Sequence, residues 1–208
     1  IRIGAITELI HSEIVDPEVR DAVVHAGTVL GEMGATVEEV SLPLTVHGGT
    51  ITGALINVES AMTYSDWIRE RLDEFGHSNK IGLLTGSILP AQAYYKVQKL
   101  RELMRRQVQK ALETYDVLIL PTSKSCAPRL ADDQPVTSKE TATVPPVMTR
   151  PFNLANAPAL SVNCGFNSQG LPIGLQIGGR PFDEETVLRV GHAYEQNTPW
   201  HKMRPPNA

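Results

Sequence analysis

Two short apolar runs separated by a polar turn mark the C-terminal third of the chain. The runs cover residues 159–162 and 172–178, and each is bracketed by Gly, Pro or Asn. A run of four to eight apolar residues with such punctuation predicts a buried strand rather than a helix. Residues 167–170, Asn-Ser-Gln-Gly, form a polar turn between the runs. We therefore expect the two strands to pair as a hairpin, with a loop slightly longer than the tightest types.

The N-terminal part of the chain shows a strand, a helix and a second strand in succession. Residues 2–7 predict a strand, and Asp16-Pro17 is a typical helix start. Apolar residues then recur at helical spacing until Gly34, which predicts the helix end, and residues 35–40 predict a second strand. Such a unit is expected to be right-handed, with its strands parallel if they are neighbours in one sheet.

The middle of the chain is mostly helical in pattern. Residues 50–62 predict one helix, and a capped second helix is expected from Ser65 to Phe75. Residues 82–89 contain Thr-Gly-Ser and are interpreted as a loop. The longest helix is predicted from Pro90 to about Thr114, with an apolar stripe on one face and basic side chains on the other. We interpret the basic face as a solvated surface, because no aromatic residues interleave with it.

The remaining elements complete an α/β pattern. Residues 116–120 predict the clearest buried strand, 121–146 form a long polar loop, and a helix is expected after Asp183. Strands that alternate with helices and end in a hairpin indicate an α/β fold with a mixed sheet. We treat residues 1–208 as a single domain.

Composition and charge exclude several classes of protein. The chain has 208 residues, 41% apolar and 20% charged, with a net charge of −4. This charge gives no global electrostatic reason for nucleic-acid binding. No apolar run approaches the length of a membrane span and no signal-peptide pattern is present, so we expect a cytoplasmic protein with no membrane partner. The two cysteines are interpreted as buried thiols in a reducing compartment rather than as a disulfide.

No metal or nucleotide site is expected from the motifs. The six histidines are not three to five residues apart and none has a cysteine at ligand spacing, so we predict neither a metal nor a cofactor. Gly178-Gly179-Arg180 follows a predicted strand and precedes a helix, which suggests a phosphate loop. The alternative that we favour is a turn in which a glycine adopts a positive φ.

A cluster of nucleophilic side chains follows the buried strand at 116–120. Ser123, Lys124, Ser125 and Cys126 are consecutive, and a serine near a lysine can form a nucleophile–base pair. Adjacent residues in an extended loop point in opposite directions, so Lys124 is badly placed to accept a proton from either serine. A polar loop is the favoured interpretation, and catalysis by this cluster stays open as an alternative.

Several motifs resemble the C-terminal half of the amidase signature family of serine hydrolases. They cover most of the chain, and 46–89 is the weakest part. The sequence also begins at Ile1 in what is predicted to be a strand, so we expect an N-terminal part to precede it. The motifs are RIG at 2–4, GATVEEV at 34–40, YDVLILPT at 115–122, FNLANAPALS at 152–161, GLPIGLQI at 170–177, RPFDEETVLR at 180–189, YEQ at 194–196 and WH at 200–201.

This resemblance implies an α/β/α sandwich on a mixed sheet, of which the chain would be the C-terminal part. It also implies hydrolysis of amides, or transfer of their ammonia, through a serine nucleophile, a second serine in a cis peptide and a lysine base. These residues belong to a Gly/Ser-rich region that has no counterpart here, since Gly48-Gly49-Thr50 has the wrong neighbours. We therefore expect no catalytic residue in this chain, an inactive fragment, and a small-molecule amide as the substrate of the full-length enzyme.

The resemblance also implies that the segments matching 84–89 and 148–153 approach the substrate. The donors among their side chains are Thr149, Arg150 and Asn153. The apolar contacts would come from Leu89, Met148 and Phe152. Two alternatives stay open: Asn153 as a buried turn amide, and Arg150 in a surface ion pair. Asn156 and Asn163 stand where the family commonly has Gly and Pro, which leaves the subfamily and the substrate open. The predicted substrate-binding residues are Leu89, Met148, Thr149, Arg150, Phe152 and Asn153.

A non-catalytic binding or assembly domain with an amidase-like fold is the alternative function. Loss of half of such a domain would expose sheet edges and apolar surface, which favours self-association into a homo-oligomer.

Overall fold

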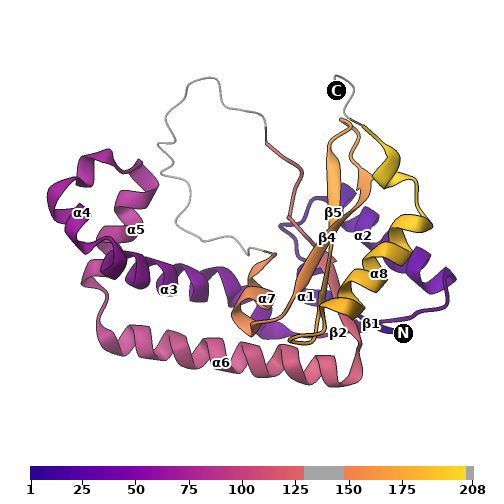
Figure 1. The fold of residues 1–208 in the computed structure, drawn as a ribbon, viewed down its shortest axis with the longest axis horizontal. Coiled ribbons are helices and arrows are strands. Elements are labelled where there is room, and N and C mark those ends of the chain that lie inside the picture. The colour runs from indigo at the N-terminus through magenta and orange to yellow at the C-terminus, as the bar shows by residue number, and fades with distance from the viewer. Residues whose placement is uncertain (129–147, 205–208) are drawn as a thin grey trace.

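The structure is a computed structural model that describes residues 1–128 and 148–204. Its centre is a five-stranded sheet with the strand order β2-β1-β3-β5-β4 (Figure 1). β1 is parallel to β2 and β3, whereas β5 is antiparallel to both β3 and β4. The predicted mixed sheet, the parallel first pair and the C-terminal hairpin are thus confirmed. The strands are β1 (Arg2–Ile6), β2 (Thr36–Val40), β3 (Val117–Pro121), β4 (Ala159–Phe166) and β5 (Pro172–Gly179).

Helices cover both faces of this sheet. Val187 of α8 lies over Gly179, and Ala22 of α2 lies near Gly165. On the opposite face, Phe152 of α7 lies over Gly178. The α-helices are α1 (Thr7–Ile10), α2 (Pro17–Glu32), α3 (Gly48–Thr63), α4 (Ser65–Glu70), α5 (His77–Ile88), α6 (Ala91–Thr114), α7 (Arg150–Ala155) and α8 (Glu184–Gln196). Short 3₁₀ helices cover Pro43–His47, Leu72–Glu74 and Trp200–Lys202.

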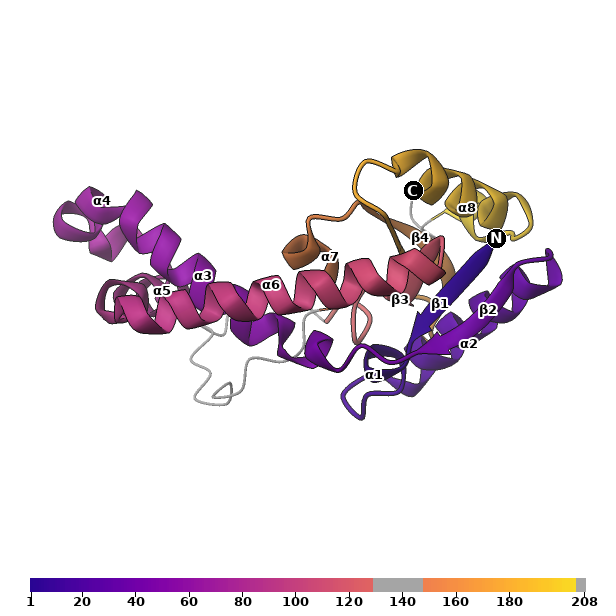
Figure 2. The same ribbon diagram turned by 90° about the horizontal axis from the view of Figure 1, so that it is seen from below.

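A helical arm extends away from the sheet. Figure 2 shows α3, α4, α5 and much of α6 reaching outward from the strands. The arm has a small core of its own at its inner end, where Ile51 and Leu55 pack against Met104 and Leu154. The main core surrounds the sheet and includes fully buried residues such as Leu118 and Leu120. The arm is therefore fixed to the sheet through α6 and α7.

The helix ends follow the predicted capping chemistry. The Asp16 carboxylate accepts a hydrogen bond from the Glu18 backbone N–H at 2.9 Å, directly before Pro17. Gly34 has a φ of 93° just after the end of α2. The Asp183 carboxylate accepts from the Thr186 hydroxyl at 2.8 Å at the start of α8. Short side-chain oxygens before a helix satisfy its first free N–H groups, so these boundaries were readable in the sequence.

The predicted loop at 82–89 is wrong, because most of it is the second half of α5. Gly82 and Gly86 are one turn apart and both face Asn57 of α3. A Cβ atom on Gly86 would collide with the Asn57 carbonyl group, so glycine lets the two helices approach closely. Glycine here serves helix packing rather than a loop.

The short helix α7 was not predicted as a separate element. Pro151 occupies its first turn and Asn156 ends it with a φ of 54°. Asparagine is the residue other than glycine that best tolerates this left-handed conformation. Asn156, which stands where the resembling family commonly has glycine, therefore preserves the helix end.

The expected positive φ at Gly178 or Gly179 is also wrong. Both residues lie inside β5, and the positive φ in this region belongs to Phe182, at 64°. A Cβ atom on Gly178 would collide with the Phe152 ring, and one on Gly179 would collide with Val187. The two glycines thus let helices on opposite faces approach the same strand.

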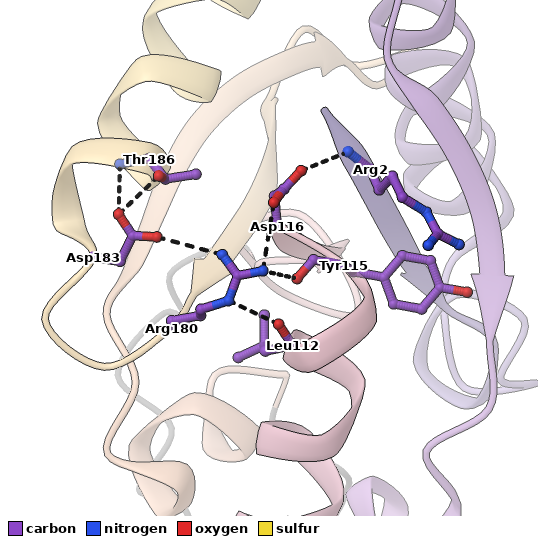
Figure 3. Close-up of polar contacts among 7 residues, drawn as sticks. All are labelled: Arg2, Leu112, Tyr115, Asp116, Arg180, Asp183 and Thr186. Atoms are coloured by element: carbon purple, nitrogen blue, oxygen red, sulfur yellow. Dashed lines mark hydrogen bonds and ion pairs between the residues drawn. The ribbon is translucent and has the colours of Figure 1, made fainter.

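Arg180 connects four elements at one end of the sheet (Figure 3). Its guanidinium donates to the carbonyl oxygens of Leu112 at 2.8 Å and Tyr115 at 3.1 Å, at the end of α6. It also pairs with Asp116 at 3.4 Å and with Asp183 at 3.7 Å. Asp116 in turn accepts from the Arg2 backbone N–H at 2.8 Å. The connection therefore joins β1, α6, β3 and the start of α8.

The two edges of the sheet differ in charge. β2 has five residues and carries Glu38 and Glu39, which pair with Arg2 at 3.0 Å and His11 at 3.3 Å. β4 has eight residues, Ala159–Phe166, and none of them is charged. Charged side chains and short length are the usual protection of an edge strand, and only β2 has them.

We predict that Asp116→Asn makes stability less dependent on acid pH. The hydrogen bond from Arg2 and the nearby Arg180 guanidinium lower the pKa of Asp116 below its ordinary value. A lowered pKa stabilises the fold above the unfolded-state pKa of about 4, and this stabilisation disappears as the pH falls through the folded pKa. Urea unfolding should show the wild type more stable by about 1 kcal/mol at pH 7, a small value because Asp116 is partly exposed. A difference that persisted unchanged at pH 2 would contradict this assignment.

We predict that Gly178→Ala destabilises the fold by about 1–3 kcal/mol, because the added methyl group would overpack the Phe152 ring. Gly31→Ala in α2 is the matched control, since nothing lies within 4 Å of the site of its new methyl group. The control should keep or slightly raise stability. Equal urea midpoints for the two variants would show that the packing of the Phe152 ring does not require a glycine at position 178.

Candidate functional site

The segment 148–153 is held against the sheet by two of its apolar residues. Met148 is 2% exposed and Phe152 is 1% exposed. Both were predicted to contact substrate, but in the described part of the chain their side chains belong to the core. The Phe152 ring lies against Gly178, where β5 offers no side chain. These two residues therefore position the segment.

The polar residues of the same segment are less buried than Met148 and Phe152, although the Arg150 Nε atom is itself buried. Thr149 and Arg150 are half-buried and Asn153 is exposed. The Asn153 side chain forms no hydrogen bond with the described residues, which argues against its interpretation as a buried turn amide. The structure thus brings together three possible donors on one anchored helix turn.

Leu89 lies apart from the other predicted residues. It directly follows α5, at the connection to α6, and is half-buried. Figure 1 shows this connection at the outer end of the helical arm, whereas α7 lies beside the sheet. The described elements therefore do not bring Leu89 next to the segment 148–153.

A pair of hydroxyl groups, on the face of the sheet that also carries α7, was missed by the sequence analysis. The oxygens of Thr122 and Ser161 are 2.6 Å apart across β5. Gly174 lies between them, and a Cβ atom there would come within 2.9 Å of both oxygens. Gln176, directly opposite Ser161, is 5% exposed, and its Oε1 has no donor among the described residues. The alternation of Ser161 with apolar residues in its strand was the available signal.

An open cavity of about 510 Å³ adjoins these hydroxyl groups. Its polar lining consists of Thr122, Ser123, Ser125, Ser161 and Asn163. Cys126, Gly174 and apolar residues such as Val162 and Ile173 line the rest.

The cluster at 123–126 does not form a nucleophile–base pair. Ser123 and Ser125 are exposed, and the Lys124 backbone oxygen accepts from the Asp16 N–H at 2.9 Å. Among the residues that the structure describes, no hydrogen bond joins the Lys124 amine to either serine hydroxyl. The geometry therefore favours the polar loop over catalysis.

Neither cysteine has the environment of a reactive thiol. Both are free, Cys164 buried and Cys126 half-buried. Burial raises the pKa of Cys164 to about 12. Burial, together with the negative charges of Asp16 and Glu18, also raises the pKa of Cys126. Because the thiolate is the nucleophilic form, neither residue is an activated nucleophile.

The basic face of α6 is partly neutralised within its own helix. Arg105 and Arg106 both pair with Glu102 at 2.8 Å. Hydrogen bonds from Arg105 and then Arg106 lower the pKa of Glu102 to about 2. These internal pairs fit a solvated helix face.

Metal-ligand clusters and membrane-spanning helices are both absent from the described ranges, 1–128 and 148–204. These ranges contain no group of three or more His, Cys, Asp or Glu residues that could hold a metal ion. No helix within them is long and apolar enough to cross a membrane.

Comparison with known proteins identifies the family. The family model described as Amidase matches residues 1–188. The chain belongs to the amidase signature family. Among curated proteins of this family, a glutamyl-tRNA(Gln) amidotransferase subunit of Brevibacillus brevis is 38% identical over 99% of the chain. Its counterpart in Oceanobacillus iheyensis is 36% identical over 93%. The chain spans 46% and 44% of these relatives, about half of their length.

Solved structures of the amidase signature family share the fold. A bacterial aryl acylamidase of the amidase signature family superposes with a TM-score of 0.84 at 22% identity, with 98% of this chain and 46% of that chain covered. A glutamyl-tRNA(Gln) amidotransferase subunit of Thermotoga maritima superposes with a TM-score of 0.77 at 25% identity, with 99% and 44% covered. The α/β fold and the mixed sheet of this amidase-signature chain are therefore those of the family.

We predict that both thiols of the folded chain resist alkylation more than an ordinary exposed thiol does. With iodoacetamide at pH 7.5, mass spectrometry should find Cys164 unmodified and Cys126 modified slowly, because raised pKa values leave little thiolate. In urea both should react at the rate of an ordinary thiol. Rapid modification of native Cys126 would instead indicate an activated thiolate and reopen the case for a nucleophile in this segment.

Proposed function

We propose that this chain is the C-terminal part of an amidase and forms one wall of its substrate pocket. The complete enzyme would hydrolyse the C–N bond of a small-molecule amide other than a peptide. Its serine, cis-serine and lysine would lie in a preceding part of the domain. The observation that carries this proposal is the family match over 1–188 in a chain whose described residues form no nucleophile–base pair.

The wall is built on α7. Phe152 and Met148 anchor the segment in the core, while Thr149, Arg150 and Asn153 present polar groups. A pocket wall of this kind needs few, firmly placed polar groups on a rigid support. Leu89 lies apart from this wall, so an apolar contact from it would come from the outer end of the arm (Figure 1).

A second candidate function is assembly, and exposed apolar residues on the arm favour it. Ile81, Leu84 and Ile88 follow each other on one face of α5 and are 54%, 46% and 82% exposed. Contiguous apolar surface of this kind often marks a protein interface. A homo-oligomer is compatible with either function.

The test compares the chain alone with a complete amidase domain that contains it. We expect no amide hydrolysis by the chain alone. In the complete domain, Asn153→Ala should lower kcat/KM up to about 10-fold, the value of a lost neutral hydrogen bond. Ser123→Ala and Ser125→Ala are the matched controls and should leave the rate unchanged.

Turnover by the chain alone that disappears in Ser123→Ala or Ser125→Ala would overturn the proposal. A complete domain with no activity on any amide, together with concentration-dependent self-association, would favour the assembly function instead.

A further inference from the structure

A cavity of about 620 Å³ lies between α2 and the strands β1, β2 and β3. It is on the face of the sheet that α2 covers, opposite to the face that carries α7. Its volume is in the range of cavities that bind small molecules.

Glycines on α2 keep this space open. Val24, Gly27 and Gly31 all line the cavity, and their spacing of three and four residues places them on one face of the helix. A Cβ atom on Gly27 would lie 3.7 Å from Val37 and 3.8 Å from Ile119, which is ordinary van der Waals contact. A Cβ atom on Gly31 would meet nothing within 4 Å. The space under α2 thus accepts a methyl group at Gly27 and more than that at Gly31.

The inner lining of the cavity is apolar. Val23 and Ile119 belong to the main core and close the cavity towards the sheet. Ala5 and Val37 are half-buried, and Val24 is 47% exposed. A ligand with an apolar body would therefore cover apolar surface that now meets water, which is favourable.

The ionisable residues that line the cavity are acidic, with the exception of one histidine. They are Glu32, Glu38, Glu39 and His11, and the described lining contains neither lysine nor arginine. Glu39 pairs with His11 at 3.3 Å. Glu38 pairs with Arg2 at 3.0 Å, whereas Glu32 takes part in no ion pair within 1–128 and 148–204. All three glutamates are exposed, so the opening of the cavity carries negative charge.

We propose that this cavity binds a small organic cation, in which an apolar body carries a protonated amine. The apolar body would lie against Val24 and Val37, and the ammonium group would pair with the carboxylates at the opening. Glu39 is on the same face of β2 as Val37, because alternate residues of a strand point to the same side. The inference goes beyond the proposed function and does not depend on it.

Charge distinguishes this ligand from other occupants. An anion would be repelled by the glutamates at the opening. A second copy of the chain, docked through the same face about a twofold axis, would bring its own Glu32 and Glu39 against these carboxylates. A neutral apolar molecule would cover the same surface but leave the negative charge without a counter-charge.

The first experiment compares three ligands of similar size on the chain itself. Hexylammonium, hexanol and hexanoate are titrated while ¹H–¹⁵N spectra are recorded. The amide resonances of Gly27 and Gly31 should shift, and that of Gly53 on α3, which does not line the cavity, should not. Hexylammonium should bind about 5-fold more tightly than hexanol, as expected for exposed charge pairs, and hexanoate should bind most weakly.

A matched pair of glycine variants tests whether the ligand occupies the cavity. Gly27→Ala should weaken hexylammonium binding by about 4-fold, the value of one lost methylene contact, since the new methyl group fills part of the space. The variant should keep or raise the stability of the fold, because the methyl group meets no close contact and alanine favours the helix. Gly53→Ala makes the same change where nothing lies within 4 Å, and it should bind as the wild type does.

The charge at the opening is tested by removing one carboxylate at a time. Glu32→Gln and Glu39→Gln should each weaken hexylammonium binding by about 3-fold and leave hexanol binding unchanged. Glu70→Gln is the matched control, because it removes the same charge from an exposed position on α4.

Several results would overturn the inference. They are equal affinity for the three ligands, no shift at Gly27 and Gly31, and wild-type binding by Gly27→Ala. The hexylammonium titration is then repeated with a complete amidase domain, where the same shifts are expected. Binding to the chain alone but not to the complete domain would show that this face is covered in the longer protein, which would also overturn the inference. None of these measurements requires amide hydrolysis, so the proposed function is tested separately.

Discussion

The contact between the Phe152 ring and the bare backbone of Gly178 decides where α7 lies. Phe152 can lie on β5 only because the strand carries no side chain there. α7 is too short to be stable alone, so its position depends on tertiary packing. The greater exposure of Thr149, Arg150 and Asn153 follows from the burial of Phe152 and Met148 beside them. A site built on so short an element depends on the strand beneath it.

Two other contacts extend this arrangement to the rest of the molecule. The Arg180 guanidinium holds the end of α6 against β3 and the start of α8, which fixes the long helix that carries the arm. Gly82 and Gly86 then let α5 approach α3 within the arm. Glycine recurs at these contacts because close approach of backbone to ring or helix to helix excludes a side chain. The sheet, α7 and the arm are thus connected by a few positions without side chains and one arginine.

The sequence predicted the elements whose signals are local. Strands 2–7 and 116–120, the caps at Asp16 and Asp183 and the C-terminal hairpin needed only periodicity and turn chemistry. The prediction from sequence failed where a glycine makes a long-range contact. The sequence does not show which residue packs against Gly86 or Gly178. The candidate site was predicted only in part for the same reason. The segment 148–153 was located, but the burial of Phe152 and the pairing of Thr122 with Ser161 depend on the sheet register.

The charge difference between the two sheet edges bears on where a further strand can pair with the sheet. An added strand next to β2 would stand beside the carboxylates of Glu38 and Glu39, whereas one next to β4 would meet only uncharged side chains. The long, uncharged β4 edge is therefore less protected against an added strand than the short, charged β2 edge. In a larger protein built on this domain, a further strand would meet fewer obstacles beside the hairpin than beside the parallel pair.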